Sequence, residues 1–194
     1  MKPAAALAIL LIGLPPTSAS AAPQSRGTCL AAPAPLERTA EQSRRHREVW
    51  SDSLWLVKQV RARYPDRLAG LYVDTASAEP VRPRLVFRVT GHDPLPPMRL
   101  GDRAAGVPVV VEYGAPHSLK QVEAIRLRVA HRLRAMLPDL QGEGYDETTG
   151  TIHLDVYAPD RTSLAAAVAR CGDLQALYGM PVRIQPLAGR VTLD

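Results

Sequence analysis

The apolar positions between Leu36 and Tyr64 follow a helical period. The first half of this segment, Glu37–Glu48, is mostly charged, so we expect a solvated stretch of helix. Pro65 ends the helix, because a residue before proline avoids helical geometry. The second half carries an apolar stripe at three- and four-residue steps, formed by Trp50, Leu54, Val57 and Val60.

Two further helices are predicted later in the chain. Ser118 and Gln121 have the spacing of a capping box, in which each side chain satisfies an amide of the other residue. This helix runs to Leu137 before Pro138, and a third helix is expected over 162–178. The apolar face of the second helix comprises Val122, Ile125, Val129, Leu133 and Met136.

Elsewhere apolar and polar residues alternate with a period of two, which is typical of half-buried strands. Three prolines in 92–106 predict a loop there, and Gly150 can adopt the positive φ that a bulged hairpin turn needs. The predicted strands are 70–74, 85–90, 107–113, 142–146, 151–157 and 182–187.

The order helix, strand, strand, crossover, strand occurs twice, and short blocks of sequence align between the copies. We therefore predict an α+β protein of two tandem related units, 45–114 and 115–187, each a small mixed or antiparallel sheet covered by helices. Chance likeness among short strands is the alternative. The aligned blocks are Leu68–Asp74 with Leu140–Asp146, Arg84–Asp93 with Thr151–Asp160, and Gly106–Val109 with Gly179–Val182.

The N-terminus has the pattern of an export signal. Lys2 precedes the apolar run 4–14, and Ala19-Ser20-Ala21 fits a small-x-small cleavage site. We expect cleavage after Ala21 and a secreted or periplasmic protein, with 22–44 as a linker and 188–194 as a tail. An uncleaved membrane anchor is the alternative, but the apolar run is short for a membrane-spanning helix.

Composition restricts the classes of partner. The chain has 194 residues, 46% hydrophobic and 22% charged, with a formal net charge of +5 that loses one unit with Lys2. So mild a positive charge does not argue for nucleic-acid binding, and export makes a nucleic-acid partner less plausible still. No run of apolar residues after the signal is long enough to span a bilayer.

Cys29 and Cys171 are the two cysteines of the chain. In an oxidising compartment such a pair suggests one disulfide, joining the N-terminal segment to the last helix. Two unrelated thiols are the alternative. Two cysteines alone cannot build a structural zinc site.

No catalytic motif stands out. The chain has no G-x-S-x-G elbow, and Ser118 is better explained as a helix cap. The pairs His92-Asp93 and His153 with Asp155 are weak metal signals. We therefore expect a protein that is not an enzyme and has no cofactor or metal, although a site assembled from scattered residues is an alternative.

The second helix has a basic surface. Its cations form either a solvated face or a docking surface for an acidic partner or an anionic envelope lipid or polysaccharide. The residues predicted to contribute are Lys120, Arg126, Arg132 and Arg134.

The paired strands resemble those of a known family. Gly70-Leu71-Tyr72-Val73-Asp74 with 85–89, and Gly144-Tyr145-Asp146 with 152–156, are similar to the pro-regions of secreted bacterial serine proteases of the alpha-lytic type. The closing strand 181–186 resembles the end of such a pro-region. The likeness covers residues 45–187 loosely.

The resemblance implies an α+β protein that folds and then inhibits a protease. In that family a strand of the second domain pairs with the protease, and the tail enters its active-site cleft. No protease follows in this sequence, so we expect such a role in trans, by strand addition. Recruitment of the module for another role is the alternative. The segment it assigns to partner binding comprises Val182, Arg183, Ile184 and Gln185.

Overall fold

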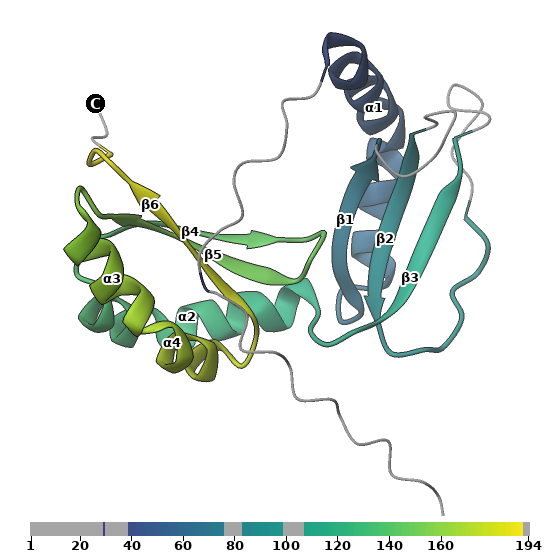
Figure 1. Cartoon of the computed structure of the whole chain (residues 1–194). Coiled ribbons are helices and arrows are strands. Elements are labelled where there is room, and N and C mark those ends of the chain that lie inside the picture. The colour runs from purple at the N-terminus through teal and green to yellow at the C-terminus, as the bar shows by residue number, and fades with distance from the viewer. Residues whose placement is uncertain (1–28, 30–38, 76–82, 99–106, 192–194) are drawn as a thin grey trace, which may run out of the picture.

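The structure, a computed structural model, describes Cys29 and residues 39–75, 83–98 and 107–191. The predicted signal 1–21, most of the linker and the end of the tail lie outside these residues. In chain order the described elements are α1 (Ala40–Arg63), β1 (Leu68–Asp74), β2 (Arg84–Thr90), β3 (Val109–Ala115), α2 (Leu119–Met136), β4 (Leu140–Asp146), β5 (Thr151–Tyr157), α3 (Arg161–Ala169), α4 (Cys171–Tyr178) and β6 (Val182–Leu187) (Figure 1).

Helix α1 packs on one face of the first sheet (Figure 1). It begins with a capping box between Thr39 and Gln42. The predicted apolar stripe is right for Val57 and Val60 but wrong for Leu54, which is 45% exposed. The reason is that the buried face is rotated by about one residue toward the N-terminal neighbours of the predicted positions. It comprises Val49, Ser53, Leu56, Val57 and Val60.

The two sheets have the same topology, as the predicted repeat requires. In each sheet the first two strands are antiparallel and the third is parallel to the second, in the orders β1-β2-β3 and β4-β5-β6. Each first strand carries a register shift at the equivalent place, before Gly70 and before Gly142. The α+β fold with two small mixed sheets is thus confirmed.

Equivalent backbone hydrogen bonds follow the sequence alignment. Leu85 donates to the Pro108 carbonyl at 3.0 Å, and Ile152 donates to the Pro181 carbonyl at 2.9 Å. Both pairs occupy aligned positions, so the two prolines directly precede equivalent strands, where a missing amide hydrogen is tolerated.

Three helices cover one face of the second sheet (Figure 1). Helix α2 begins with the predicted capping box of Ser118 and Gln121, and Val122, Val129 and Leu133 are buried beneath it. The single helix predicted over 162–178 is wrong: it is divided into α3 and α4 at Arg170, whose amide bonds to the Ala167 carbonyl at 3.1 Å, a tighter turn than α-helical.

The hairpin of the second unit docks against the first unit (Figure 1). The Leu71 amide donates to Oε2 of Glu147 at 2.7 Å, and the Arg88 guanidinium donates to the Glu147 carbonyl at 3.0 Å. Tyr145 donates to the Ala69 carbonyl at 3.5 Å. The open edge of β1 is therefore covered by the β4–β5 turn, and the units form one body through polar contacts.

Candidate functional site

Strand β3 lies at one edge of the first sheet. In a parallel pair, alternate residues bond to the neighbouring strand, and Pro108 already bonds to Leu85 on β2. By this alternation the amides and carbonyls of Val109 and Val111 point away from β2, and beyond Glu112 the register shifts. No described residue is hydrogen-bonded to them.

The corresponding edge of the second sheet is different, because Cys29 lies on it. The Ile184 amide on β6 donates to the Cys29 carbonyl at 2.6 Å. Two residues on, Pro186 has no amide hydrogen to offer. The side chains of Val182 and Ile184 are buried in the core. Strand addition at 182–185 stays a prediction, and one donor that it would use, the Ile184 amide, is already bonded to Cys29.

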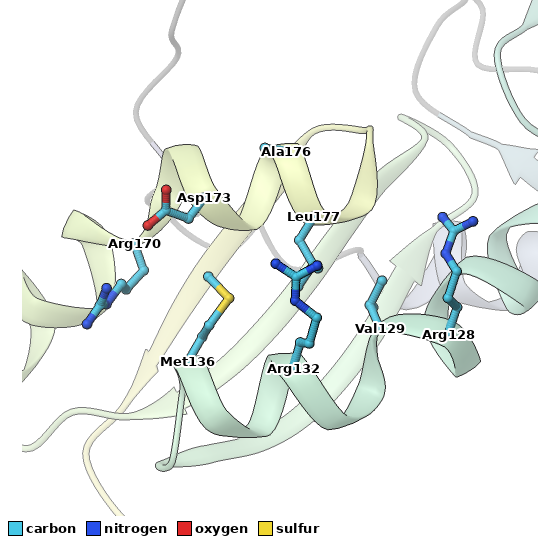
Figure 2. Close-up of a pocket in the computed structure, with 8 residues that line it drawn as sticks. All are labelled: Arg128, Val129, Arg132, Met136, Arg170, Asp173, Ala176 and Leu177. Carbon is cyan, nitrogen blue, oxygen red and sulfur yellow. The ribbon is translucent and has the colours of Figure 1, made fainter.

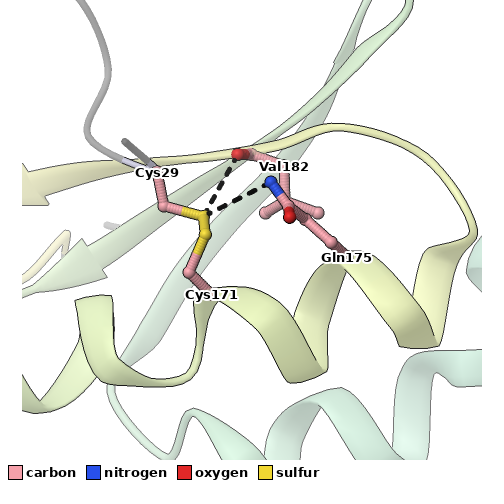
Figure 3. The surroundings of a disulfide bond; sticks show 4 residues. All are labelled: Cys29, Cys171, Gln175 and Val182. Atoms are coloured by element: carbon pink, nitrogen blue, oxygen red, sulfur yellow. Dashed lines mark hydrogen bonds between the residues drawn. A yellow bond between two sulfur atoms is a disulfide. The ribbon is translucent and has the colours of Figure 1, made fainter. Parts of the chain in front are cut away.

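A disulfide between Cys29 and Cys171 holds this segment in place (Figure 3). The Cα atoms are 5.8 Å apart, and Cys29 is 2% exposed within the core of the second unit. Its Sγ lies 3.4 Å from the Val182 carbonyl oxygen, and the Gln175 amide group approaches it at 3.9 Å. The predicted pairing is the one that the structure contains.

A groove of about 630 Å³ lies between α2 and α4 (Figure 2). Its floor is apolar, and Leu177 reaches down from α4 toward the Arg132 guanidinium on α2. Three arginines and one carboxylate, Asp173, surround it. The lining residues are Arg128, Val129, Arg132, Met136, Arg170, Asp173, Ala176 and Leu177.

The predicted basic residues fall into two groups. Lys120 pairs with Asp66 at 2.8 Å, and Arg126 pairs with Glu143 at 3.0 Å, so both are engaged within the protein. Arg132 lines the groove and Arg134 is exposed, and neither makes an ion pair with a described residue. The basic helix therefore offers only part of the predicted surface.

Arg170 is a groove residue that sequence reasoning missed. It lies on another element, at the junction of α3 and α4, more than thirty positions from Arg132. Only the packing of α4 on α2 brings it to the same groove. Glu147 was also missed as a contact residue, because its turn resembled an ordinary acidic loop.

A polar network crosses the core beneath α2. Tyr178 is 1% exposed, and its hydroxyl donates to Oε1 of Glu143 at 3.0 Å. Arg126 donates to the same oxygen, also at 3.0 Å. Burial, followed by the charge of Glu143, raises the pKa of Tyr178 above its ordinary value.

Replacing Tyr178 by phenylalanine should cost about 1 kcal/mol at neutral pH, because Glu143 keeps Arg126 as a partner. A raised folded pKa means that ionisation is easier in the unfolded chain. Tyr178 therefore loses its stabilising effect as pH rises above about 10, the pKa of a free tyrosine.

Urea unfolding between neutral pH and pH 11 checks this: Tyr178→Phe should lose less stability than the native chain over that range. Tyr157→Phe on β5 is the control and should follow the native chain. Parallel pH profiles for the Tyr178→Phe variant and the native chain would contradict the assignment.

Two of the histidines contact residues that are close to them in space. His92 packs against Gly114, whose φ is +83°, and Nε2 of His153 is 3.9 Å from Asp146. Within residues 39–75, 83–98 and 107–191 no group of three or more His, Cys, Asp or Glu side chains could hold a metal ion. No described helix is long and apolar enough to cross a membrane.

Comparison with known proteins identifies no family: no protein-family model matches the chain, and no curated protein matches it.

Proposed function

We propose that this protein is an exported, non-enzymatic module that binds a protein partner, which adds an extended segment to the free edge of β3. The supporting observation is that the outward amides and carbonyls of Val109 and Val111 have no hydrogen bond to a described residue, because unpaired edges are templates for strand addition.

Three features favour the edge of β3 over those of β1 and β6. The β1 edge is covered by Glu147 and Tyr145. The β6 edge carries Cys29. The strand Val109–Ala115 itself is rich in valine and half-exposed, a composition that favours cross-strand packing.

A secreted serine protease is the partner that we propose. The signal-like N-terminus supports a location outside the cytoplasm, and the strands resemble those of protease pro-regions. An inhibitor or folding assistant acting in trans needs only main-chain complementarity at an edge and a fixed scaffold behind it, which the docked units supply.

Val111→Pro tests the edge. Proline removes the outward amide and places a ring there, while edge strands tolerate it structurally. Val111→Thr keeps the amide and nearly the same shape, and is the matched control. Binding to a purified alpha-lytic-type protease is measured by the inhibition of peptide hydrolysis. It should weaken about tenfold or more in Val111→Pro and stay unchanged in Val111→Thr.

Urea unfolding of both variants separates loss of binding from loss of fold. Equal inhibition by the two variants would exclude β3 as the docking edge. Absence of inhibition by the native chain would exclude this class of protease as the partner.

A further inference from the structure

The groove between α2 and α4 carries positive charge that the protein does not neutralise. Arg128, Arg132 and Arg170 are exposed and make no ion pair with any described residue. Asp173 is the one carboxylate among the described residues that line the groove. Guanidinium groups form paired hydrogen bonds with carboxylates, so the rim of the groove is complementary to acidic side chains.

The arginines are spread along the groove and do not converge on one point. Arg128 and Arg132 are four positions apart on α2 and therefore follow one side of that helix. Arg170 lies at the start of α4, at the other end of the groove from Arg128 (Figure 2). This spacing fits an elongated acidic segment better than a single small anion.

Apolar side chains occupy only part of the space between the two helices. Met136 points from α2 and Leu177 from α4 toward that space, while Ala176 adds only a methyl group (Figure 2). The cavity of about 630 Å³ that is left has the size of a binding site. An apolar side chain of a partner would cover Met136 and Leu177 and displace water from them.

A protein segment matches this arrangement better than a bilayer does. The apolar groups of the groove lie between two helices, where a projecting side chain can reach them and a flat surface cannot. None of the large apolar side chains exposed in the described part of the chain lines the groove. A membrane would therefore meet positive charge here without an apolar anchor, and stable binding at a membrane surface uses both.

We propose that the α2–α4 groove binds an acidic amphipathic helix of a protein partner, with carboxylates at Arg128, Arg132 and Arg170 and an apolar side chain over Met136 and Leu177. Carboxylates four positions apart on a helix lie along one side, as Arg128 and Arg132 do on α2. Insertion of the apolar face of a helix into a groove is a recurring mode of recognition. This inference goes beyond strand addition at β3 and does not depend on it.

Fluorescence anisotropy with a designed peptide tests the site. The chain is exported from a bacterial host, so that the Cys29–Cys171 disulfide forms. It is then titrated into a labelled helical peptide of glutamate, leucine and alanine, with the leucines on one side and the glutamates beside them. In two matched peptides, glutamine replaces every glutamate or serine replaces every leucine. The first peptide should bind about tenfold more tightly than either of the others, because it alone satisfies both the arginines and the apolar floor.

Variants of the chain place the binding in the groove. The triple variant Arg128→Gln, Arg132→Gln, Arg170→Gln should bind the first peptide about tenfold more weakly, because three charge-assisted contacts are lost. A control triple variant removes the same formal charge from exposed residues that do not line the groove and make no ion pair with a described residue. It should change binding by less than about threefold. The control residues, each changed to glutamine, are Lys58 and Arg61 on α1 and Arg134 on α2.

Equal losses in the two triple variants would overturn the proposal, because net charge alone would then explain binding. Equal binding of the three peptides, or no binding by the native chain, would overturn it as well. Displacement of the first peptide by phosphatidylglycerol vesicles would assign the groove to a lipid surface instead. Val111→Pro should bind the peptide like the native chain, so failure of the groove and failure of the β3 edge are separate results.

Discussion

Removing the Cys29–Cys171 disulfide should lower the free energy of unfolding by up to about 5 kcal/mol. The bond joins residues separated by 142 positions. In the chain-entropy model, opening a loop of that length gives the unfolded chain about 5 kcal/mol of additional freedom. The largest effect is expected because Cys29 is also buried against β6.

Urea unfolding of Cys29→Ala, Cys171→Ala measures the loss. Reductant is the matched control: it should move the native chain to the midpoint of the double variant and leave the double variant unchanged. The Ile184 amide, bonded to the Cys29 carbonyl, should exchange faster with solvent in both reduced forms. Coinciding oxidised and reduced curves would show that the N-terminal segment contributes nothing.

Gly70→Ala should disturb the docking of the two units and lower the free energy of unfolding. A Cβ at Gly70 would collide with the Glu147 carbonyl oxygen and lie 3.0 Å from the Glu147 Cβ. Those atoms belong to a turn held by Leu71 and Arg88, so it cannot move without losing both hydrogen bonds. We expect a loss of about 1–3 kcal/mol, the range for overpacking, in thermal or urea unfolding.

The repeat supplies the control. Gly142 is equivalent to Gly70, but a Cβ there would meet the carboxylate of Asp155 at 2.8 Å, the end of a side chain that can rotate. Gly142→Ala should therefore cost less than Gly70→Ala. If the two variants lose equal stability, the loss comes from strand geometry and not from the docking of the hairpin.

The repeated strand order could be predicted because it follows from patterns among residues that are close in sequence. Alternating apolar residues, the Ser118–Gln121 capping box and Gly150 at φ +75° depend on residues close in sequence. The block alignment then placed Pro108 and Pro181 at equivalent positions, which the hydrogen bonds of β2 and β5 confirm. Periodicity of this kind also indicates which residues of each strand face the core.

Contacts between distant segments could not be read in the same way. Leu54 fits a helical period as well as its neighbours do, and only the packing of α1 on the sheet shows that it is exposed. Likewise, Arg126 looks like any other surface cation until β4 brings Glu143 beneath it. Contacts between distant segments depend on topology, which a short stretch of sequence does not show.

Sequence alone was sufficient for the α+β class, the two related units and the pairing of two cysteines as a candidate bond, because period, spacing and residue type are local quantities. Tertiary structure decided which edges are covered. Cys29 lies on β6 and Glu147 on β1, while β3 has no such cover among the described residues. It also joined Arg170 to Arg132, since a groove exists only where two helices pack.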